Sequence, residues 1–185
     1  GYYGNHSLGI SEKIEVDFKE WTAEEKTEYH AQMEADRQAA EQAKQEAIDA
    51  CIAKAQKIWP TLQDNAVNEY LNRKQVKAFG VRFCAGKLVV PMYNNGQLVS
   101  LQWIEADGSK KFMTGTPKKG AYFFISKPQP SSEVIALAEG YATAATIHMA
   151  TGWPVFVAFD AGNLEPVAQF IRAKWPQTKI LICAD

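Results

Sequence analysis

Three acidic side chains stand at the ends of three apolar runs in the last third of the chain: Glu139, Asp160 and Asp185. Carboxylates gathered in one place can hold hard divalent cations or move protons. An acid that follows a single apolar run is more often a helix cap or a loop residue. Three acids in equivalent positions favour a metal or acid–base site.

The segments around these acids alternate between predicted strands and helices. Apolar runs at residues 134–138, 155–159 and 179–184 predict strands, and residues 141–151 and 164–175 predict the helices between them. The runs lack polar–apolar alternation, which is typical of parallel strands buried on both faces. Because the carboxyl ends of parallel strands lie at one edge of a sheet, we expect the three acids to share that edge.

Basic side chains are concentrated just before this region. Residues 61–130 hold 10 Lys and Arg against 4 Asp and Glu, whereas residues 1–60 hold 7 against 12 and residues 131–185 hold 3 against 5. A basic segment beside carboxylates favours a surface for a polyanion, and solvated lysines clustered by chance are the open alternative. The candidate cations are Arg73, Arg82, Lys110, Lys111, Lys118 and Lys119.

The basic segment is predicted to fold as a short helix followed by a small antiparallel sheet. Asp64 is the expected cap of the helix, and a further helical turn is expected to end at Gly80. The sequences Asn94-Asn95-Gly96 and Asp107-Gly108 predict hairpin turns. Strands are expected at residues 81–84, 87–93, 97–104, 110–113 and 121–125.

A long helix is predicted over residues 24–59. Thr22 and Glu25 have the spacing of a capping box. Small apolar residues recur every three or four positions and predict docking from about Ala43 onward, with the first half in solvent. A partner-binding arm and a spacer both fit this pattern, and the spacer is favoured because alanine packs poorly in a coiled-coil seam.

The composition excludes several classes of protein. The 185 residues are 46% hydrophobic with a net charge of -1, which fits one ordinary domain or two small ones. No apolar run approaches the roughly 20 residues of a membrane span. The three cysteines are too few and too far apart for a disulfide framework or a zinc ribbon. A cytoplasmic protein without zinc and without membrane contact is therefore expected.

The acidic motifs resemble the two signature elements of the Toprim domain, which bacterial-type DNA primases, topoisomerases and some nucleases share. One element is a glutamate after the first strand, and the other is Asp-x-Asp after the third. The matching stretches are residues 138–144 and 182–185, and the wider match is most similar to primases of conjugative plasmids and prophages, which are mobile elements. Residues 70–74, 80–83, 88–91 and 111–120 resemble the basic subdomain that precedes Toprim in such primases.

This resemblance implies an α/β fold: a Toprim-like parallel sheet with flanking helices, preceded by a small α+β basic subdomain and a long N-terminal helix. The expected domains are residues 1–60 (tail and long helix), 61–130 (basic subdomain) and 131–185 (first part of Toprim). The second aspartate of Asp-x-Asp would lie beyond Asp185, and the chain starts at Gly1. A fragment that is inactive alone is therefore expected.

The resemblance also implies a function, that of a DNA primase: a nucleotidyltransferase that makes short RNA primers on single-stranded DNA during DNA replication. Mg²⁺ or Mn²⁺ would be the cofactor. Glu139 and Asp185 would be catalytic and bind metal, with Glu139 as ligand or general base. Asp160 would be a further metal candidate or only a helix cap.

The basic residues receive roles in the same way. Lys111 and Lys119, each beside a second lysine (Lys110 and Lys118), would contact triphosphate or template phosphates, and Arg73 and Arg82 would line the template path. The implied partners are single-stranded DNA, nucleoside triphosphates, and a helicase or another replication protein. Two alternatives stay open: strand cleavage by another Toprim enzyme, and a non-catalytic module that binds single-stranded DNA or docks a partner.

Overall fold

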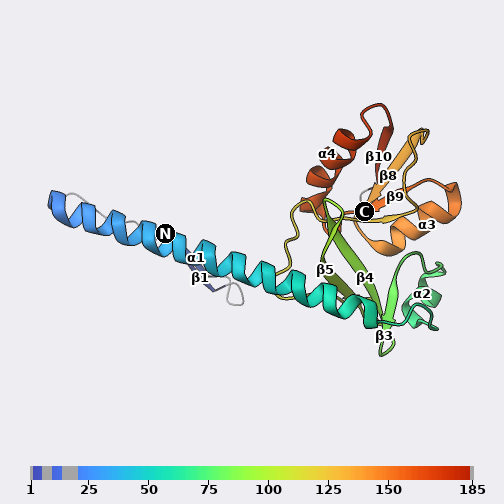
Figure 1. Ribbon diagram of the computed structural model, residues 1–185, viewed down its shortest axis with the longest axis horizontal. Coiled ribbons are helices and arrows are strands. Elements are labelled where there is room, and N and C mark those ends of the chain that lie inside the picture. Colours follow the sequence, from blue (N-terminus) through green and yellow to red (C-terminus); the bar gives the residue numbers. More distant parts are fainter. Residues whose placement is uncertain (1, 6–9, 14–20, 184–185) are drawn as a thin grey trace. The chain divides into compact units, whose positions relative to one another are not determined.

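The chain consists of two compact units, Gly1–Lys44 and Gln45–Asp185. The computed structural model describes residues 2–5, 10–13 and 21–183. The long helix α1 (Ala23–Ile58) begins in the first unit and ends in the second (Figure 1). The described candidate site residues all belong to the second unit, and the division into three domains at residues 60 and 130 stays a prediction.

The first unit contains a strand pair and the start of α1. Strands β1 (Tyr2–Asn5) and β2 (Ile10–Lys13) pair antiparallel. The predicted capping box is present: the Glu25 amide donates to Thr22 Oγ1 at 3.2 Å, and the Thr22 amide donates to Glu25 Oε2 at 2.7 Å. Hydrogen bonding to Thr22 lowers the pKa of Glu25. The predicted helix is therefore confirmed together with its cap.

The second part of α1 packs on the antiparallel sheet from about Ala47, whose backbone lies against Gly115, one turn after the predicted start near Ala43. Ala43 is exposed, and the first buried side chain is Cys51. Ala55 is fully buried and forms a small core with apolar residues of the sheet. The 3₁₀ turn η1 (Trp59–Thr61) follows, where Pro60 has no amide hydrogen to continue the helix.

The basic segment forms a four-stranded antiparallel sheet. Its hairpin turns lie where Asn95-Gly96 and Asp107-Gly108 predict them, and Asn95, Gly96 and Gly108 have positive φ angles. The strand order is β3-β4-β5-β6. The strands are β3 (Arg82–Cys84), β4 (Lys87–Asn94), β5 (Gln97–Ile104) and β6 (Lys110–Phe112).

Three local predictions in this segment are wrong. The strand expected at residues 121–125 becomes β7 (Phe123–Ile125), which pairs with β9 in the other sheet. The helix α2 (Glu69–Lys74) begins later than predicted and is capped by Asn68, whose side chain accepts from the Leu71 amide, while Asp64 forms an ion pair with Arg82. The chain also leaves the helix at Gln75 in a left-handed conformation, without a further helical turn before Gly80.

The second sheet has the predicted parallel core. Strand β8 is central, with β10 and β9 parallel to it on either side, and β7 is the antiparallel edge strand. The elements are β8 (Val134–Ala138), α3 (Tyr141–Thr151), β9 (Val155–Val157), η2 (Ala161–Asn163), α4 (Leu164–Lys174) and β10 (Lys179–Cys183). The predicted α/β class with a long N-terminal helix is therefore confirmed.

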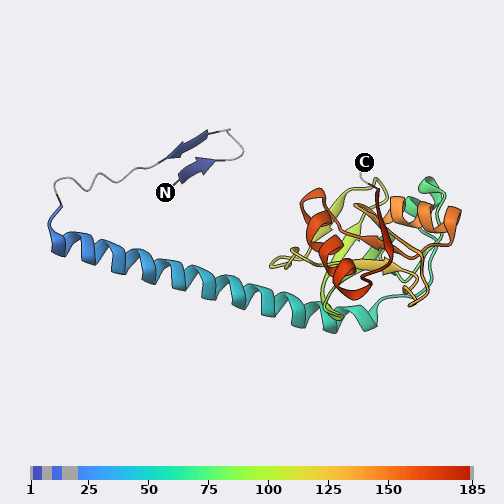
Figure 2. The same cartoon turned by 90° about the horizontal axis from the view of Figure 1, so that it is seen from above.

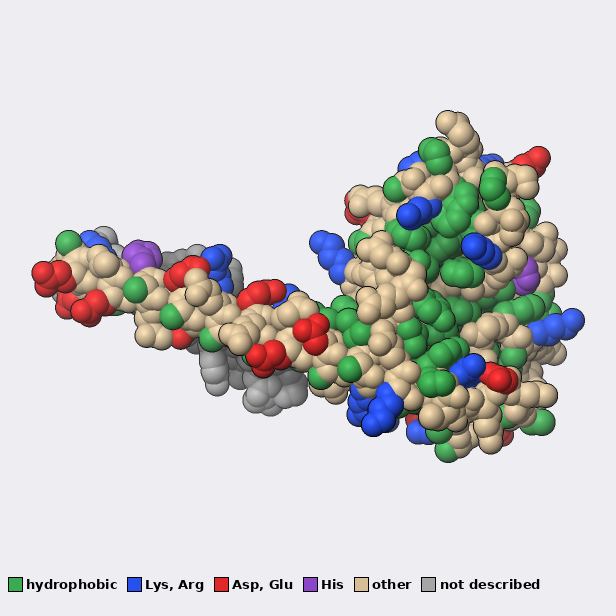
Figure 3. Space-filling view, viewed as in Figure 1, with side chains coloured by type: hydrophobic (Ala, Val, Ile, Leu, Met, Phe, Trp, Pro, Cys, Tyr) green, Lys and Arg blue, Asp and Glu red, His purple; other side chains and the backbone are tan. Residues whose placement is uncertain are grey.

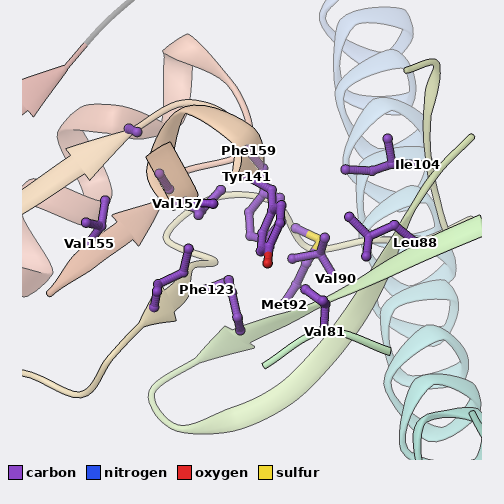
Figure 4. Close-up of a cluster of buried hydrophobic side chains, with 14 of the residues drawn as sticks. Val81, Leu88, Val90, Met92, Ile104, Phe123, Tyr141, Val155, Val157 and Phe159 are labelled. Atoms are coloured by element: carbon purple, nitrogen blue, oxygen red, sulfur yellow. The ribbon is translucent and has the colours of Figure 1, made fainter. Parts of the chain in front are cut away.

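Two apolar cores cover the two faces of this sheet, with α3 and α4 on different sides of the strands (Figure 2). Val167 and Ile171 of α4 pack on one face. On the other face, Tyr141 of α3 meets side chains of the antiparallel sheet such as Val90 and Met92 (Figure 4). The antiparallel sheet thus packs against the face that also carries α3.

Tyr141 joins these layers by hydrogen bonds as well as by packing. It is fully buried, its hydroxyl accepts from the Phe79 amide at 2.7 Å, and it donates to the Lys77 carbonyl at 3.3 Å. Burial raises the pKa of Tyr141. The start of α3 is therefore held against the segment that leads into β3.

None of the helices within the described residues combines the length and the apolar character that crossing a membrane requires.

Candidate active site

Glu139 and Asp160 lie at the same edge of the parallel sheet, as predicted. Glu139 follows β8 and Asp160 lies three residues beyond β9. The two strand ends stay hydrogen-bonded past the strands themselves, because the Phe159 amide donates to the Glu139 carbonyl at 2.8 Å. Both acidic side chains are partly exposed. This pair of acids, with the residues that surround it, is called the acidic edge below.

Asp185 lies outside the described residues. The last described residue of β10 is Cys183, which pairs with Ala138, the residue before Glu139. Within the described part of the chain, no group of three or more metal-ligating side chains forms a cluster. The metal role predicted for Glu139, Asp160 and Asp185 together therefore stays a prediction.

The alternative role of Asp160 as a helix cap is not observed. Asp160 precedes η2, but its side chain makes no capping hydrogen bond. Asn163, the residue that precedes α4, does not cap that helix with its side chain either. Asp160 therefore remains a partly exposed carboxylate at the acidic edge.

Asn163 has a different task, which the sequence pattern did not reveal. It is 3% exposed, and its Nδ2 donates to the carbonyls of Ala121 and Ala158 at 2.8 Å each. Its Oδ1 accepts from the Gly120 amide at 2.7 Å. Asn163 thus fastens the loop that carries Lys118 and Lys119 to the end of β9. An asparagine just before a predicted helix looks like a cap, so no sequence signal indicated this contact.

Phe159 holds a strained backbone position beside Asp160. Its φ angle of 72° lies in the left-handed region, which costs a bulky side chain of the order of 1 kcal/mol. Its ring packs edge-on against Phe112 of β6, with the ring centres 6.3 Å apart. This contact brings the last strand of the antiparallel sheet to the acidic edge.

Lys110 points toward the acidic edge, whereas Lys111 does not. A β-carbon built on Gly140 would lie 3.4 Å from Lys110 Nζ, so this ammonium group sits directly beside the residue that follows Glu139. Lys111 pairs across the sheet with Trp103, on the opposite face. The resemblance favoured Lys111 for phosphate contact, but of the two it is Lys110 that lies beside Gly140, the residue after Glu139.

Lys118 lies against the ring of Phe112 on β6. Its Nζ lies 4.3 Å from the centre of the Phe112 ring, a cation–π distance, and Phe112 in turn contacts Phe159. Lys119 is exposed, and its carbonyl accepts a long hydrogen bond from Asn94 Nδ2 at 3.5 Å. The two members of each lysine pair in the sequence therefore have different surroundings.

The two candidate arginines lie elsewhere in the second unit. Arg82 is held by Asp64, 2.9 Å from its Nε, and by the ring of Trp59, whose centre is 4.7 Å from its guanidinium carbon. Arg73 lies against the turn between β5 and β6, where it adds to the effect of the Ser109 hydrogen bonds in lowering the pKa of Asp107. None of these contacts involves the acidic edge.

Two acids and Lys110 thus lie at the acidic edge, and Phe159 and Phe112 connect this edge to Lys118. The visible face of the second unit in Figure 3 shows apolar side chains gathered in its middle, with Lys and Arg side chains set singly around them. Carboxylates with lysines nearby can bind a polyanionic substrate and the divalent cations that accompany it. Such a combination suits phosphoryl or nucleotidyl transfer.

Comparison with known proteins relates about half of the chain to primases. No family model matches the sequence. Over 102 residues, 54% of this chain, the sequence is 34% identical to a DNA primase TraC of Escherichia coli. A second DNA primase TraC of Escherichia coli is 33% identical over the same length of sequence. The matches cover 10% and 7% of those two proteins, so the chain spans a tenth or less of their length.

A solved structure is similar more distantly. It contains bacteriophage T7 lagging-strand DNA polymerase interacting with primase domains of two gp4 subunits bound to an RNA/DNA hybrid and dTTP. The similarity covers 63% of this chain and 61% of the other, with a TM-score of 0.43 and 19% sequence identity. By its sequence similarity to the two TraC proteins, half of this chain is homologous to DNA primases of the plasmid type, as its motifs indicated.

Proposed function

We propose that this chain carries the nucleotidyl-transfer centre of a DNA primase, an enzyme that makes short RNA primers on a single-stranded DNA template. The observation that carries the proposal is the position of Lys110 beside Gly140, next to two carboxylates on neighbouring strand ends. The similarity of 102 residues to DNA primase TraC supports the same reaction.

The reaction needs cations more than it needs a covalent nucleophile. A 3′-hydroxyl attacks the α-phosphate of a nucleoside triphosphate, and pyrophosphate leaves with the bonding electron pair. Negative charge grows on phosphate oxygens during this step, so a favourable site offers positive charge that is already in place. Lys110 supplies such a charge at the acidic edge, and Lys118, beside Phe112, supplies a second one.

The carboxylates fit Mg²⁺ or Mn²⁺ as the cofactor. Mg²⁺ is commonly held by one or two carboxylates together with substrate phosphates, and Glu139 and Asp160 offer that number of hard oxygen ligands. Asp185 is proposed as a further ligand. Bound divalent ions supply charge neutralisation at the phosphate oxygens. Glu139 acts either as a ligand or as the acceptor of the proton from the 3′-hydroxyl.

The remaining cations are assigned to nucleic acid. Lys111, Lys119 and Arg73 are exposed, and phosphate contacts by such side chains position a strand without reading its sequence. Arg82 is proposed for the template path by resemblance alone, because its guanidinium group already contacts Asp64 and Trp59. A helicase or another replication protein is the proposed partner of the whole enzyme.

The test is template-dependent incorporation of ribonucleotides by the natural gene product that carries this sequence, in the presence of Mg²⁺. We expect Glu139→Gln to reduce incorporation by about 10²–10⁴-fold, because the amide neither accepts a proton nor neutralises a cation. The control is Glu133→Gln, since Glu133 precedes β8 at the opposite end of the same strand and should leave incorporation unchanged.

Other results would point to other functions. Nicking of DNA without synthesis would replace the proposal with strand cleavage. Salt-sensitive binding of single-stranded DNA that ignores Glu139→Gln, with no turnover, would indicate a non-catalytic binding module.

A further inference from the structure

A pocket lies where the second part of α1 passes the antiparallel sheet (Figure 1). Its volume is about 580 Å³, which is within the usual range for ligand sites. Ala47, Ala50 and Ile58 of the helix line one wall, and Trp103 of β5 and Met113, which follows β6, line the other. All of these residues belong to the second unit. This space is called the α1 pocket below.

Contacts within the second unit hold the walls of the α1 pocket in place. Gly115 lies against the backbone of Ala47, where a β-carbon would collide with the Ala47 carbonyl. The Thr116 hydroxyl donates to the Met113 carbonyl at 2.6 Å and lies 2.7 Å from Ser100 Oγ. The loop after β6 is therefore fastened to both the helix and the sheet. A pocket with such fixed walls loses little conformational entropy when a partner binds.

The lining of the α1 pocket is mostly apolar, although the pocket is open to solvent. Ala47 and Ala50 are exposed, and Ile58, Trp103 and Met113 are only partly buried. The last three residues border the small core beneath α1 without being enclosed by it. Because apolar surface is transferred favourably out of water, a partner that covers these side chains gains affinity.

Two ammonium groups flank this apolar lining. Lys54 lines the pocket from α1, and Lys111 is the cross-strand partner of Trp103, so it emerges on the same face of the sheet. Both lysines are exposed, and neither forms an ion pair within residues 2–5, 10–13 and 21–183. Among the described residues that line the pocket, none is acidic. The α1 pocket therefore combines an apolar cavity with positive charge at its border.

A nucleic-acid strand fits this surface less well than a peptide does. Within residues 45–58 of α1, Glu46 and Asp49 balance Lys54 and Lys57, whereas a strand with one phosphate per nucleotide is bound by a positively charged groove. A base would also bring its hydrogen-bonding edges into an apolar pocket, and burying them without partners is unfavourable. A large apolar side chain needs no hydrogen-bond partner, and a carboxylate next to it can reach Lys54.

We propose that the α1 pocket binds a peptide segment of a partner protein in which acidic residues flank a large apolar side chain. The apolar side chain enters the pocket between Ala50 and Trp103 and supplies most of the affinity, and the flanking carboxylates pair with Lys54 and Lys111. Lys110 lies on the other face of the sheet, so this docking site does not depend on nucleotidyl transfer. Because Lys111 also belongs to the proposed nucleic-acid contacts, the test uses Lys54.

The test is an NMR titration of the isotope-labelled 185-residue chain with a synthetic peptide, Gly-Asp-Glu-Phe-Glu-Asp-Gly, blocked at both ends. We expect saturable shifts of the indole N–H signal of Trp103 and of the amide signals of Ala47 and Ala50. The same peptide with Ala in place of Phe should bind about tenfold more weakly or worse, because it lacks the side chain that enters the pocket.

Matched variants of α1 locate the binding. Ala50→Phe should fill the pocket and weaken peptide binding by about tenfold or more, whereas Ala53→Phe, at an exposed position outside the pocket, should leave it unchanged. Both variants replace an exposed alanine of the same helix, so their effects on helix stability are similar. Lys54→Gln should weaken binding about two- to fivefold and reduce its salt dependence. Its control is Lys174→Gln, at the exposed end of α4.

Three results would each overturn the proposal. Equal binding of the Phe and Ala peptides, or equal effects of Ala50→Phe and Ala53→Phe, would show that no side chain enters the pocket. Binding of single-stranded oligothymidylate that Ala50→Phe abolishes, without binding of the peptide, would assign the pocket to nucleic acid. A dimer in sedimentation that Ala50→Phe dissociates would assign it to a second copy of the chain.

The outcomes also separate this proposal from the primase function. RNA synthesis by Ala50→Phe should equal that of the unmodified protein, because the pocket does not border the acidic edge. Peptide binding in a protein that makes no RNA keeps the docking site and removes the primase function. Primer synthesis by a protein that does not bind the peptide removes the docking site and leaves the primase function standing.

Discussion

The two faces of the antiparallel sheet carry similar residues in different surroundings. On the face toward α3, Ile104 pairs with Lys110 and Gln102 pairs with Phe112, and these partners reach the acidic edge. On the face toward α1, the cross-strand row is Arg82, Val89, Trp103 and Lys111. Since side chains alternate along a strand, adjacent lysines in the sequence point to opposite sides of the sheet.

The face toward α1 is built for packing. Val89 and Leu101 are fully buried with Ala55 of the helix. The guanidinium group of Arg82 contacts Asp64 and Trp59, which both follow the end of α1. The basic segment therefore does not form a single surface. Some of its cations make contacts that stabilise the fold, and others remain available to bind a ligand.

Among the variants that compare the two faces, the largest expected effect is the difference between the adjacent residues Lys110 and Lys111. We expect Lys110→Gln to lower kcat/KM for nucleotide incorporation about ten- to one-hundredfold, because it removes a charge at the acidic edge. Lys111→Gln should lower it by less than about tenfold and should mainly reduce the salt dependence of template binding. Steady-state kinetics and a salt titration of both variants measure this. Equal losses in the two variants would break the distinction between the faces.

A smaller effect concerns the contact between α3 and the segment before β3. Tyr141→Phe should destabilise the protein by about 1–3 kcal/mol, because the Phe79 amide loses its acceptor in a buried place. Chemical denaturation measures this free energy of unfolding. A variant as stable as the unmodified protein would show that packing alone holds the face toward α3.

The same tyrosine makes stability depend on alkaline pH. Burial raises the pKa of Tyr141 in the folded protein, whereas the unfolded chain loses this proton near pH 10. The stabilising contribution is therefore complete below about pH 10 and decreases as the pH rises further. Tyr141→Phe should show a weaker loss of stability above pH 10 than the unmodified protein.

The smallest effect is expected on the face toward α1. Arg82→Gln should lower the free energy of unfolding by about 1 kcal/mol through its contacts with Trp59 and the exposed Asp64. Lys74→Gln, on the exposed side of α2, is the control and should change stability by less than about 0.5 kcal/mol. If Arg82→Gln instead keeps its stability and loses template binding, the template role of Arg82 gains support.

The elements and the acidic edge could be predicted because strong local signals determine them. The apolar runs before Glu139 and Asp160 predict parallel strands, and the carboxyl ends of neighbouring parallel strands lie at the same edge of a sheet. The partner of β7 could not be predicted, since Phe123–Ile125 is an apolar run that suits either sheet. Pairing between distant strands depends on tertiary packing, which single-sequence patterns do not contain.

The details of the site were harder to predict, because they depend on strand register and on contacts between residues far apart in the sequence. Which lysine lies beside Gly140 depends on the register of β6, and a shift of one residue would exchange Lys110 and Lys111. Two of the three hydrogen bonds of Asn163 described above join residues more than 40 positions apart, so no local pattern indicates them. The cap assigned to Asp64 was wrong because α2 begins only at Glu69, where Asn68 caps it, and Asp64 instead pairs with Arg82.

The central claim is that the acidic edge and the face toward α3 form one site that binds divalent ions. Its most direct test is paramagnetic broadening of backbone NMR signals by Mn²⁺, in the presence of a non-hydrolysable nucleoside triphosphate. We expect the amides of Lys110, Gly140 and Asp160 to broaden first, and Glu139→Gln to abolish this effect. Broadening centred on the acidic first turns of α1, or unchanged in Glu139→Gln, would contradict it.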